Sequence, residues 1–198
     1  MIHAETISGT ITSEGWLIEA AHIPSPNFDE RPENVKIDLI VIHNISLPPG
    51  EFGGHFIDQL FTNTLNPQEH PYFQTISTLR VSSHILIHRL GDVVQYVSFN
   101  KRAWHAGQSN YQGRERCNDF AIGIELEGTD DTPYTDAQYQ QLALLIQLLW
   151  AHYPTLKPEH LTGHSDIAPG RKTDPGLAFD WPRLRQMLHD VHDNDNSV

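Results

Sequence analysis

A stretch of fourteen residues, GHSDIAPGRKTDPG at positions 163–176, is crowded with side chains that can do chemistry. It holds a histidine, two aspartates and two adjacent cations, while its glycines and prolines favour turns. Histidine and carboxylate side chains are zinc ligands, and a catalytic zinc takes three such ligands plus a water. Because the metal lowers the pKa of that water to about 7, such a site supplies hydroxide at neutral pH. The composition of this stretch therefore suits part of a hydrolytic metal site.

Three residues are the candidate ligands: His43, His164 and Asp174. His43 directly follows the apolar run at 39–42, His164 lies near the start of the polar stretch, and Asp174 precedes a Pro-Gly pair that fixes its backbone. Their spacing alone does not select them, because many proteins contain two histidines and an aspartate at such separations. Asp166 remains a rival to Asp174, although its place two residues after His164 favours capping of its own turn.

The sequence gives less support to other hydrolytic mechanisms. There is no HExxH or CxxC motif and no GxSxG elbow, although a Ser-His-Asp triad stays open on composition. The single cysteine, Cys117, lies in no recognised nucleophile signature. No glycine-rich loop suited to a phosphate group is present. The residues themselves thus leave a metal site as the best-supported chemistry without fixing its ligand set.

The segment at 120–127 is the clearest predicted strand, because apolar residues alternate along it with Ala121, Gly123, Glu125 and Glu127. The second set shares one face, on which small residues precede two carboxylates. We expect the small residues to leave open space, so that this face forms the floor of a cleft. Glu125 and Glu127 both lie on this face, and alternation alone does not say which carboxylate would act as a general base.

The remaining elements must hold these side chains in place. The continuous apolar run at 39–42 predicts a strand buried on both faces. A hairpin is predicted at 79–99 and a short helix at 55–63. Two further helices follow: one at 135–153, with a Thr-x-x-Gln capping box, and a short one at 179–190. The pattern predicts an α/β (α+β-like) fold, a central mixed sheet flanked by helices with its functional residues at strand ends.

Length and composition set the frame for this fold. The 198 residues predict a single domain, with a core at about 15–185, an N-terminal arm at 1–14 and a flexible acidic tail at 190–198. The net charge of −12 argues against a nucleic-acid partner, and no apolar run reaches the length of a membrane span. A single cysteine and an N-terminus without a leader-like segment favour the cytoplasm.

Four segments carry a resemblance to a known family: IVIHNISLPPGEFGG, RAWHAGQSNYQGRERCND, IGIELEGTD and TGHSDIAPGRKTDPG. Together they closely resemble the AmpD-type N-acetylmuramoyl-L-alanine amidases, which are zinc enzymes of the amidase and peptidoglycan-recognition-protein superfamily. The likeness runs from about residue 15 to about residue 185, and it implies the amidase/peptidoglycan-recognition-protein fold.

The resemblance implies roles for five positions, and this sequence has the family's residue at each. The metal ligands map onto His43, His164 and Asp174, which would hold one Zn²⁺ per chain. A glutamate that acts on the water maps onto Glu125, and a lysine that stabilises the developing oxyanion maps onto Lys172. Both roles agree with the chemistry expected of those side chains.

Substrate contacts are a separate set of predictions. Trp104 and His105 lie beside a glycine and are candidates for a sugar or peptide wall, although a core tryptophan is an equal interpretation. Asn44 follows a ligand and is a candidate for hydrogen bonding to the peptide. Arginines pair bidentately with carboxylates, so the arginine candidates for the substrate's carboxylates are Arg80, Arg116 and Arg114. His84 is expected to be a satisfied sheet histidine, with a supporting role at the site as the alternative.

The resemblance implies a cytoplasmic amidase of cell-wall recycling. Its substrate would be a small muropeptide, cut between the lactyl group of 1,6-anhydro-N-acetylmuramic acid and L-alanine, with no nucleic acid, membrane or obligate protein partner. Two alternatives stay open. A non-catalytic peptidoglycan-binding module would commonly lack a full metal set, and an exported or phage-type lytic amidase would call for a targeting segment or a wall-binding domain.

Overall fold

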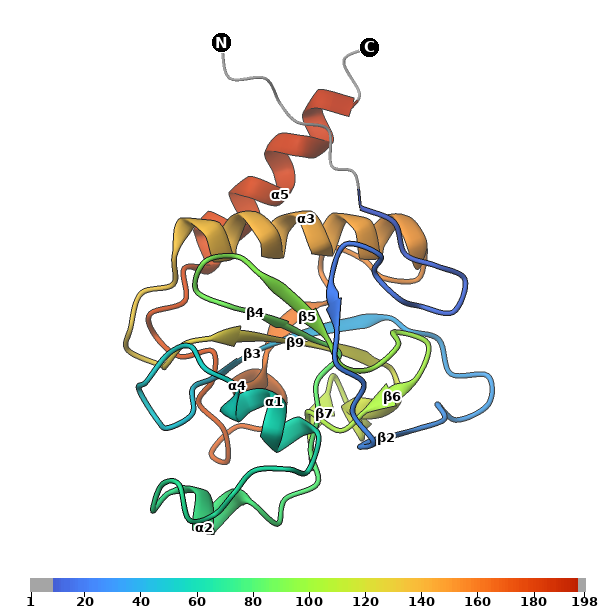
Figure 1. Ribbon diagram of the computed structural model, residues 1–198. Coiled ribbons are helices and arrows are strands. Elements are labelled where there is room, and N and C mark those ends of the chain that lie inside the picture. The colour runs from blue at the N-terminus through green and yellow to red at the C-terminus, as the bar shows by residue number, and fades with distance from the viewer. Residues whose placement is uncertain (1–8, 196–198) are drawn as a thin grey trace.

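The computed structural model describes residues 9–195, and it centres on a six-stranded mixed sheet (Figure 1). The strand order is β1-β5-β4-β9-β3-β10. Four neighbours run parallel, β4, β9, β3 and β10, while β5 is antiparallel to β4. The strands are β1 (Ala21–His22), β3 (Leu39–Ile45), β4 (Ile85–Ile87), β5 (Val93–Gln95), β9 (Ala121–Glu127) and β10 (Leu161–Gly163).

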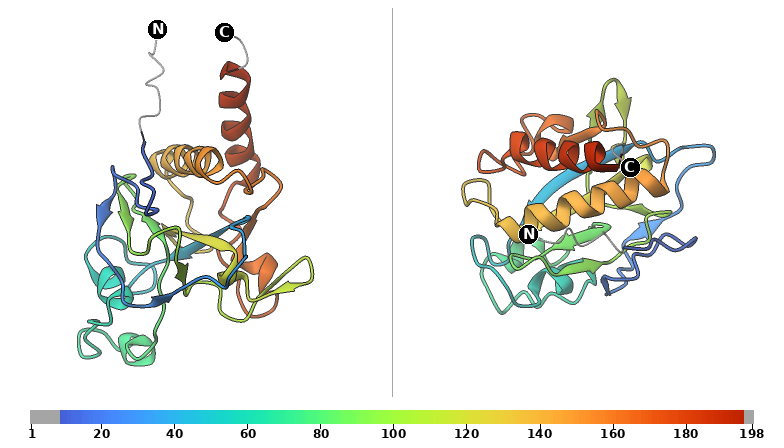
Figure 2. Two further views of the ribbon diagram at one scale, coloured as in Figure 1. Left: turned by 90° about the vertical axis from the view of Figure 1, so that its right-hand side faces the viewer. Right: turned by 90° about the horizontal axis from the view of Figure 1, so that it is seen from above.

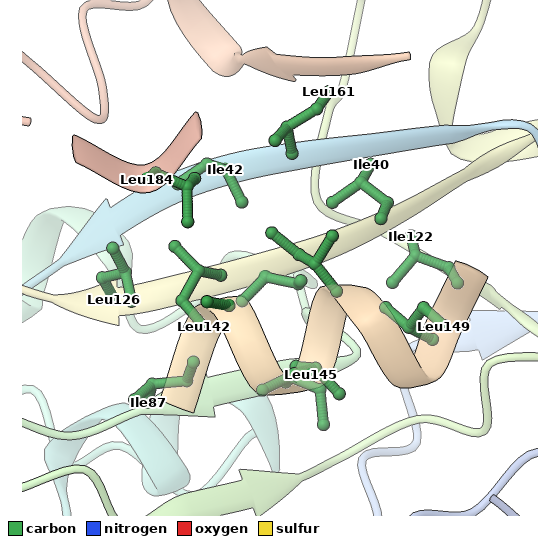
Figure 3. Close-up of a cluster of buried hydrophobic side chains, with 14 of the residues drawn as sticks. Ile40, Ile42, Ile87, Ile122, Leu126, Leu142, Leu145, Leu149, Leu161 and Leu184 are labelled. Atoms are coloured by element: carbon green, nitrogen blue, oxygen red, sulfur yellow. The ribbon is translucent and has the colours of Figure 1, made fainter. Parts of the chain in front are cut away.

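One face of the sheet is covered by a long helix, α3 (Asp136–His152), with α5 (Trp181–Asp195) packed beside it (Figures 1 and 2). The capping box predicted at its start is present, because Thr135 and Gln138 bond to each other's backbone N–H groups. Figure 3 shows the apolar core that results. It joins β3 and β9 to the sheet-facing side of α3, through Ile40, Ile42, Ile122, Leu142, Leu145 and Leu149, and residues of β4, β10 and α5 complete it.

The opposite face carries shorter elements. The helices α1 (Phe56–Phe61) and α2 (Phe73–Ile76) pack with β4 and β5 in a second apolar cluster. A third cluster joins β3 and β9 to the short helices η1 (Cys117–Asp119) and α4 (His164–Ile167). The predicted mixed sheet flanked by helices is therefore confirmed. In Figure 1 this second face is the lower one, where the short helices are joined by loops.

Two small antiparallel pairs complete the fold. β2 (Phe28–Asp29) pairs with β6 (Arg102–Ala103), and β7 (Asn110–Tyr111) pairs with β8 (Arg114–Glu115). Within residues 9–195, no helix combines the length and apolarity needed to cross a membrane.

The ends of the chain differ from the sequence expectation. No strand was predicted before residue 39, but β1 lies at one edge of the main sheet and β2 pairs with β6. Residues 1–8 of the expected arm lie outside the described residues, whereas Ile11 bridges Leu17 and packs on the core. The last helix continues to Asp195 rather than ending near 190, because no glycine or proline follows to stop it. Residues 196–198 lie outside the described part.

Candidate active site

The carboxyl ends of three parallel strands, β10, β3 and β9, meet at one edge of the sheet. Gly163 of β10 is in register with Ile42 of β3, and His43 is in register with Glu125 of β9. His164 directly follows Gly163. The sheet register therefore sets His164, His43 and Glu125 in a row, although they are far apart in the sequence.

Three side chains converge at this edge, and we call them the ligand cluster: His43, His164 and Asp174. The Nδ1 atoms of the two histidines are 2.9 Å apart, and Oδ2 of Asp174 lies 3.1 Å from His43 Nδ1 and 3.0 Å from His164 Nδ1. Both histidines are buried, and Asp174 is partly buried. The structure thus brings together all three predicted ligands, each with one donor atom facing the other two.

The ligand cluster fits a divalent metal such as zinc. Ligand atoms at ~2.0–2.1 Å in a tetrahedron are ~3.3 Å apart, so the cluster needs to open by only a few tenths of an ångström. Burial lowers the pKa of His43 to about 4, which keeps its imidazole neutral. Burial alone would raise the pKa of Asp174, but contacts with His164 and His43 outweigh it and hold that pKa below its ordinary value. A neutral imidazole and an ionised carboxylate are the forms that bind metal.

Glu125 lies beside the ligand cluster with a free oxygen. Its side chain is buried, and Oε2 has no hydrogen-bond partner among the described residues. Burial and the charge of Asp174 raise its pKa well above the ordinary value, while the charge of Lys172 opposes that shift. An unpartnered carboxylate oxygen next to a metal-binding cluster is suited to holding and deprotonating a water.

The two rival acids have other partners. Glu127 accepts hydrogen bonds from the backbone N–H groups of Gly53 and Arg89, and it also contacts the ring of His88. Asp166 accepts hydrogen bonds from the N–H of Gly163 and the hydroxyl of Thr162, as expected of a residue that caps its own turn. Neither carboxylate is part of the ligand cluster.

The ligand cluster opens into a cleft of about 570 Å³. Its lining includes polar groups, among them Glu125 and the exposed Lys172. It also includes apolar and aromatic residues from the segments around α1, α2 and β6: Leu47, Tyr72, Ile76, Leu79, Val81 and Trp104. A cleft that combines a few polar groups with apolar and aromatic residues is typical of a small-molecule site.

The five predicted substrate contacts divide into two groups. Trp104, His105 and Asn44 line the cleft. The Asn44 amide, however, donates to Asp130 and to the carbonyl of Pro175, so it holds the loop that follows Asp174. Arg80 and Arg116 are not among the residues that line the cleft in this structure, so their contact with substrate stays a prediction. Arg80 bonds to backbone carbonyls at 78 and 79, and Arg116 pairs with Asp119 and lines a separate cavity.

The expectation of open space above Gly123 is also wrong. The ring of His105 occupies that space, and a Cβ placed on Gly123 would lie 2.4 Å from it. The small residue therefore makes room for a histidine rather than for substrate. His84 is a satisfied sheet histidine as expected, because its Nδ1 accepts the N–H of Gly123. Arg114, the third arginine considered, pairs with Asp38 and covers the ring of Phe120.

Some supporting residues were not predicted. Arg171 donates to the carbonyls of Ala106 and Gln108, and so connects the ligand-bearing loop to the loop after β6. Tyr134 donates to the carbonyl of Pro175, which Asn44 also binds. The adjacent cations of the RK pair were visible in the sequence, but nothing indicated that the first would bind backbone rather than substrate.

Comparison with known proteins places this geometry in a family. Residues 33–177 match the family model described as N-acetylmuramoyl-L-alanine amidase. The chain belongs to the N-acetylmuramoyl-L-alanine amidase family. That span contains every residue of the ligand cluster together with Glu125 and Lys172.

Individual amidases show how close the relationship is. The chain is 63% identical to 1,6-anhydro-N-acetylmuramyl-L-alanine amidase AmpD of Salmonella typhimurium strain SL1344, over 90% of this chain and 95% of that protein. A crystal structure of a selenomethionine AmpD derivative matches with a TM-score of 0.87 at 61% identity, over 90% of this chain and 99% of that one. The resemblance and fold predicted from the sequence are thereby confirmed.

A more distant amidase has been solved with a ligand. The N-acetylmuramyl-L-alanine amidase AmiD from E. coli, in complex with anhydro-N-acetylmuramic acid-L-Ala-D-gamma-Glu-L-Lys, matches with a TM-score of 0.57 at 28% identity. The match covers 89% of this chain and 65% of that one.

Proposed function

We propose that this chain is a zinc-dependent amidase that hydrolyses the bond between 1,6-anhydro-N-acetylmuramic acid and L-alanine in small muropeptides. Membership of the amidase family and the 63% identity to AmpD support the reaction and the substrate. The observation that carries the chemistry is the position of Glu125, whose unpartnered oxygen lies beside the ligand cluster.

The proposed cofactor is one Zn²⁺ held by His43, His164 and Asp174. A zinc ion bound there would supply a water of lowered pKa and would polarise the scissile carbonyl. The set of two histidines and one carboxylate leaves a fourth position for that water, as catalytic zinc sites do.

Glu125 is the proposed general base and acid. Its carboxylate removes a proton from the attacking water as the water oxygen bonds to the carbonyl carbon. The same carboxyl group then gives the proton to the nitrogen of L-alanine, and the carbon–nitrogen bond breaks. The products are the sugar lactate carboxylate and the free amino terminus of the peptide. Because burial raises the pKa of Glu125, both the uptake and the return of a proton are accessible near neutral pH.

Lys172 is proposed to stabilise the negative charge that develops on the carbonyl oxygen. Its side chain lines the cleft within electrostatic reach of Glu125. A cation fixed where charge develops acts on the transition state more than on the bound substrate. Trp104 and the apolar lining residues are proposed to hold the sugar or the peptide stem. Arg80 and Arg116 stay proposed partners for the substrate's carboxylates, because both side chains are exposed and arginine pairs bidentately with carboxylates.

Two competing functions make different predictions. A non-catalytic binding module would have no use for a complete ligand cluster with an unpartnered base beside it. An exported lytic amidase would act on polymeric peptidoglycan. We propose that the present enzyme acts in the cytoplasm on soluble muropeptides, as the anhydromuramyl specificity named for its AmpD relatives suggests.

The test is a measurement of metal content and activity on one preparation. We expect about one zinc per chain, release of peptide from anhydromuramyl-tripeptide, much slower action on intact peptidoglycan, and loss of activity on chelation that added zinc restores. His164→Ala and Asp174→Ala should lose both zinc and activity. Full activity in these two variants would reject the ligand cluster, and equal rates on polymer and muropeptide would reject the proposed substrate. Cell fractionation with a marker enzyme tests the proposed location.

A further inference from the structure

The two histidines of the ligand cluster share a feature that the proposed mechanism does not use. Each turns Nδ1 toward the cluster, and each turns Nε2 toward the segment Trp104–Gly107, which we call the WHAG segment. The Nε2 of His43 lies 2.9 Å from Nδ1 of His105, and the Nε2 of His164 lies 3.1 Å from the carbonyl of Ala106. Two consecutive residues thus contact the outer nitrogens of both histidines.

The contact with Ala106 matches the tautomer that His164 needs when it binds a metal. Both ring nitrogens of His164 face an acceptor, because Nε2 lies 3.1 Å from the Ala106 carbonyl and Nδ1 lies 3.0 Å from Oδ2 of Asp174. A neutral histidine that binds a metal through Nδ1 carries its proton on Nε2, and the Ala106 carbonyl is in place to accept it. The backbone of the WHAG segment therefore supplies the acceptor for the metal-binding form of this histidine.

His105 provides the corresponding contact for His43. A neutral histidine that binds a metal through Nδ1 carries its proton on Nε2, and that proton needs an acceptor in a buried site. Nδ1 of His105 is the atom in place to accept it. The His105 ring stacks edge-on against His43 and His84, and it fills the space above Gly123, so it has little freedom to turn.

Other contacts hold the WHAG segment itself. The side-chain oxygen of the buried Asn118 accepts the N–H groups of both His105 and Ala106, at 3.1 and 2.8 Å. The N–H of Trp104 donates to Ser82, and Arg171 donates to the Ala106 carbonyl. Three side chains thus hold in place the segment that supplies the acceptors for both histidines.

We propose that the WHAG segment is the support of the metal site, and that His105 is a positioning residue that orients His43 rather than a substrate contact. This inference rests on the proposed zinc function. Partners of this kind fix ring orientation and tautomer, and their loss typically costs about 10- to 100-fold in metal affinity or activity. His105→Leu removes the acceptor and leaves the Nε2–H of His43 without a partner. His105→Asn keeps an oxygen at the position of Nδ1 and so keeps the acceptor.

The first experiment compares zinc dissociation constants, measured by competition with a chromophoric chelator. We expect His105→Leu to weaken zinc binding about 10- to 100-fold, and His105→Asn to recover most of that loss. The matched control is His160→Leu. His160 is also partly buried, packs edge-on against an aromatic ring and has a buried ring nitrogen without a hydrogen-bond partner among the described residues, but it precedes β10 at the other end of that strand. This control should bind zinc as the unchanged chain does.

The second experiment needs no variant. Long-range proton–nitrogen NMR spectra of the zinc-bound chain should show the His164 proton on Nε2, and zinc should shift the Nδ1 signals of both ligand histidines. Unchanged zinc affinity in a folded His105→Leu variant would overturn the role of His105, and a proton on Nδ1 of His164 in the zinc-bound chain would overturn the role of the Ala106 carbonyl. Absence of zinc binding in the unchanged chain would instead reject the proposed function, so the two failures are distinguishable.

Discussion

Strand β9 contains two glutamates, Glu125 and Glu127, which lie two residues apart on the same face of the strand. Both carboxylates are buried, with Glu125 8% exposed and Glu127 2% exposed. Glu125 has an oxygen without a partner, and its pKa is raised by burial. Burial would also raise the pKa of Glu127, but hydrogen bonds from His88, Gly53 and Arg89 outweigh it and lower that pKa. Similar burial thus gives opposite chemistry.

The difference lies in the donors that other segments supply. The Glu127 carboxylate binds backbone N–H groups of the loop before α1 and of the hairpin of β4 and β5, and so holds these two segments together. Glu125 instead lies beside the ligand cluster and Lys172, and its carboxylate remains available for water. One glutamate stabilises the folded chain, and the other is destabilised as an anion and so is prepared to exchange a proton.

Exchanging the charged group at Glu125 should have the largest effect. Glu125→Gln keeps the shape but cannot accept a proton, so we expect the turnover rate to fall about 10²- to 10⁴-fold. Zinc content should stay at about one per chain, because Glu125 is not one of the three cluster residues. Steady-state kinetics and metal analysis check both points. A variant that lost its zinc would show that Glu125 is a ligand or a structural support.

The next largest effect is expected at Lys172, the cation whose charge opposes the rise in the pKa of Glu125. Lys172→Met removes the cation but keeps much of the side-chain length. We expect the turnover number to fall about 10²- to 10³-fold with little change in KM, because the charge is needed in the transition state. Equal activity of the variant and the unchanged chain would make Lys172 an ordinary surface lysine.

Glu127→Gln is the matched variant on the other side of the comparison. The loss of charge weakens hydrogen bonds to two backbone N–H groups, so the free energy of unfolding should fall by about 1–3 kcal/mol. Urea denaturation with unchanged slope measures this loss. At a temperature where both proteins are folded, zinc affinity should be unaffected. If this variant lost its rate while Glu125→Gln retained activity, the assignments of the two glutamates would have to be exchanged.

The sequence could predict part of this comparison. The alternation along residues 120–127 placed Glu125 and Glu127 on one face, and the strand formed as expected. Alternation cannot say which carboxylate is free, because the donors to Glu127 come from Gly53 and Arg89, on segments distant in the sequence. Only the family resemblance favoured Glu125.

The prediction of open space above Gly123 was wrong for the same reason. The pattern of small residues correctly indicated room above Gly123, but the side chain that fills this room, His105, arrives from a loop on another part of the chain. Likewise, the placement of His164 beside His43 depends on β10 pairing with β3, a parallel pairing without a local sequence signal. Local pattern thus predicted the longer elements, such as the strand at 120–127 and the helix at 135–153, whereas tertiary contacts decided which side chains remained available.

The smallest expected effect is the pH dependence of the contact between His88 and Glu127. The hydrogen bond to Glu127 raises the pKa of His88 above 6.5. The contribution of the His88 charge to the free energy of unfolding is therefore complete below pH 6.5, and it is lost as the pH rises through the raised pKa. The pKa of Glu127 lies below 4.5, so its contribution is present above pH 4.5 and is lost on acidification. The contact should therefore stabilise the fold most between about pH 4.5 and 6.5. His88→Asn should cost about 0.5–1 kcal/mol in that window and less above it. Urea denaturation of both proteins at several pH values measures the difference, and a cost that grew with rising pH would show that His88 contributes as a neutral group.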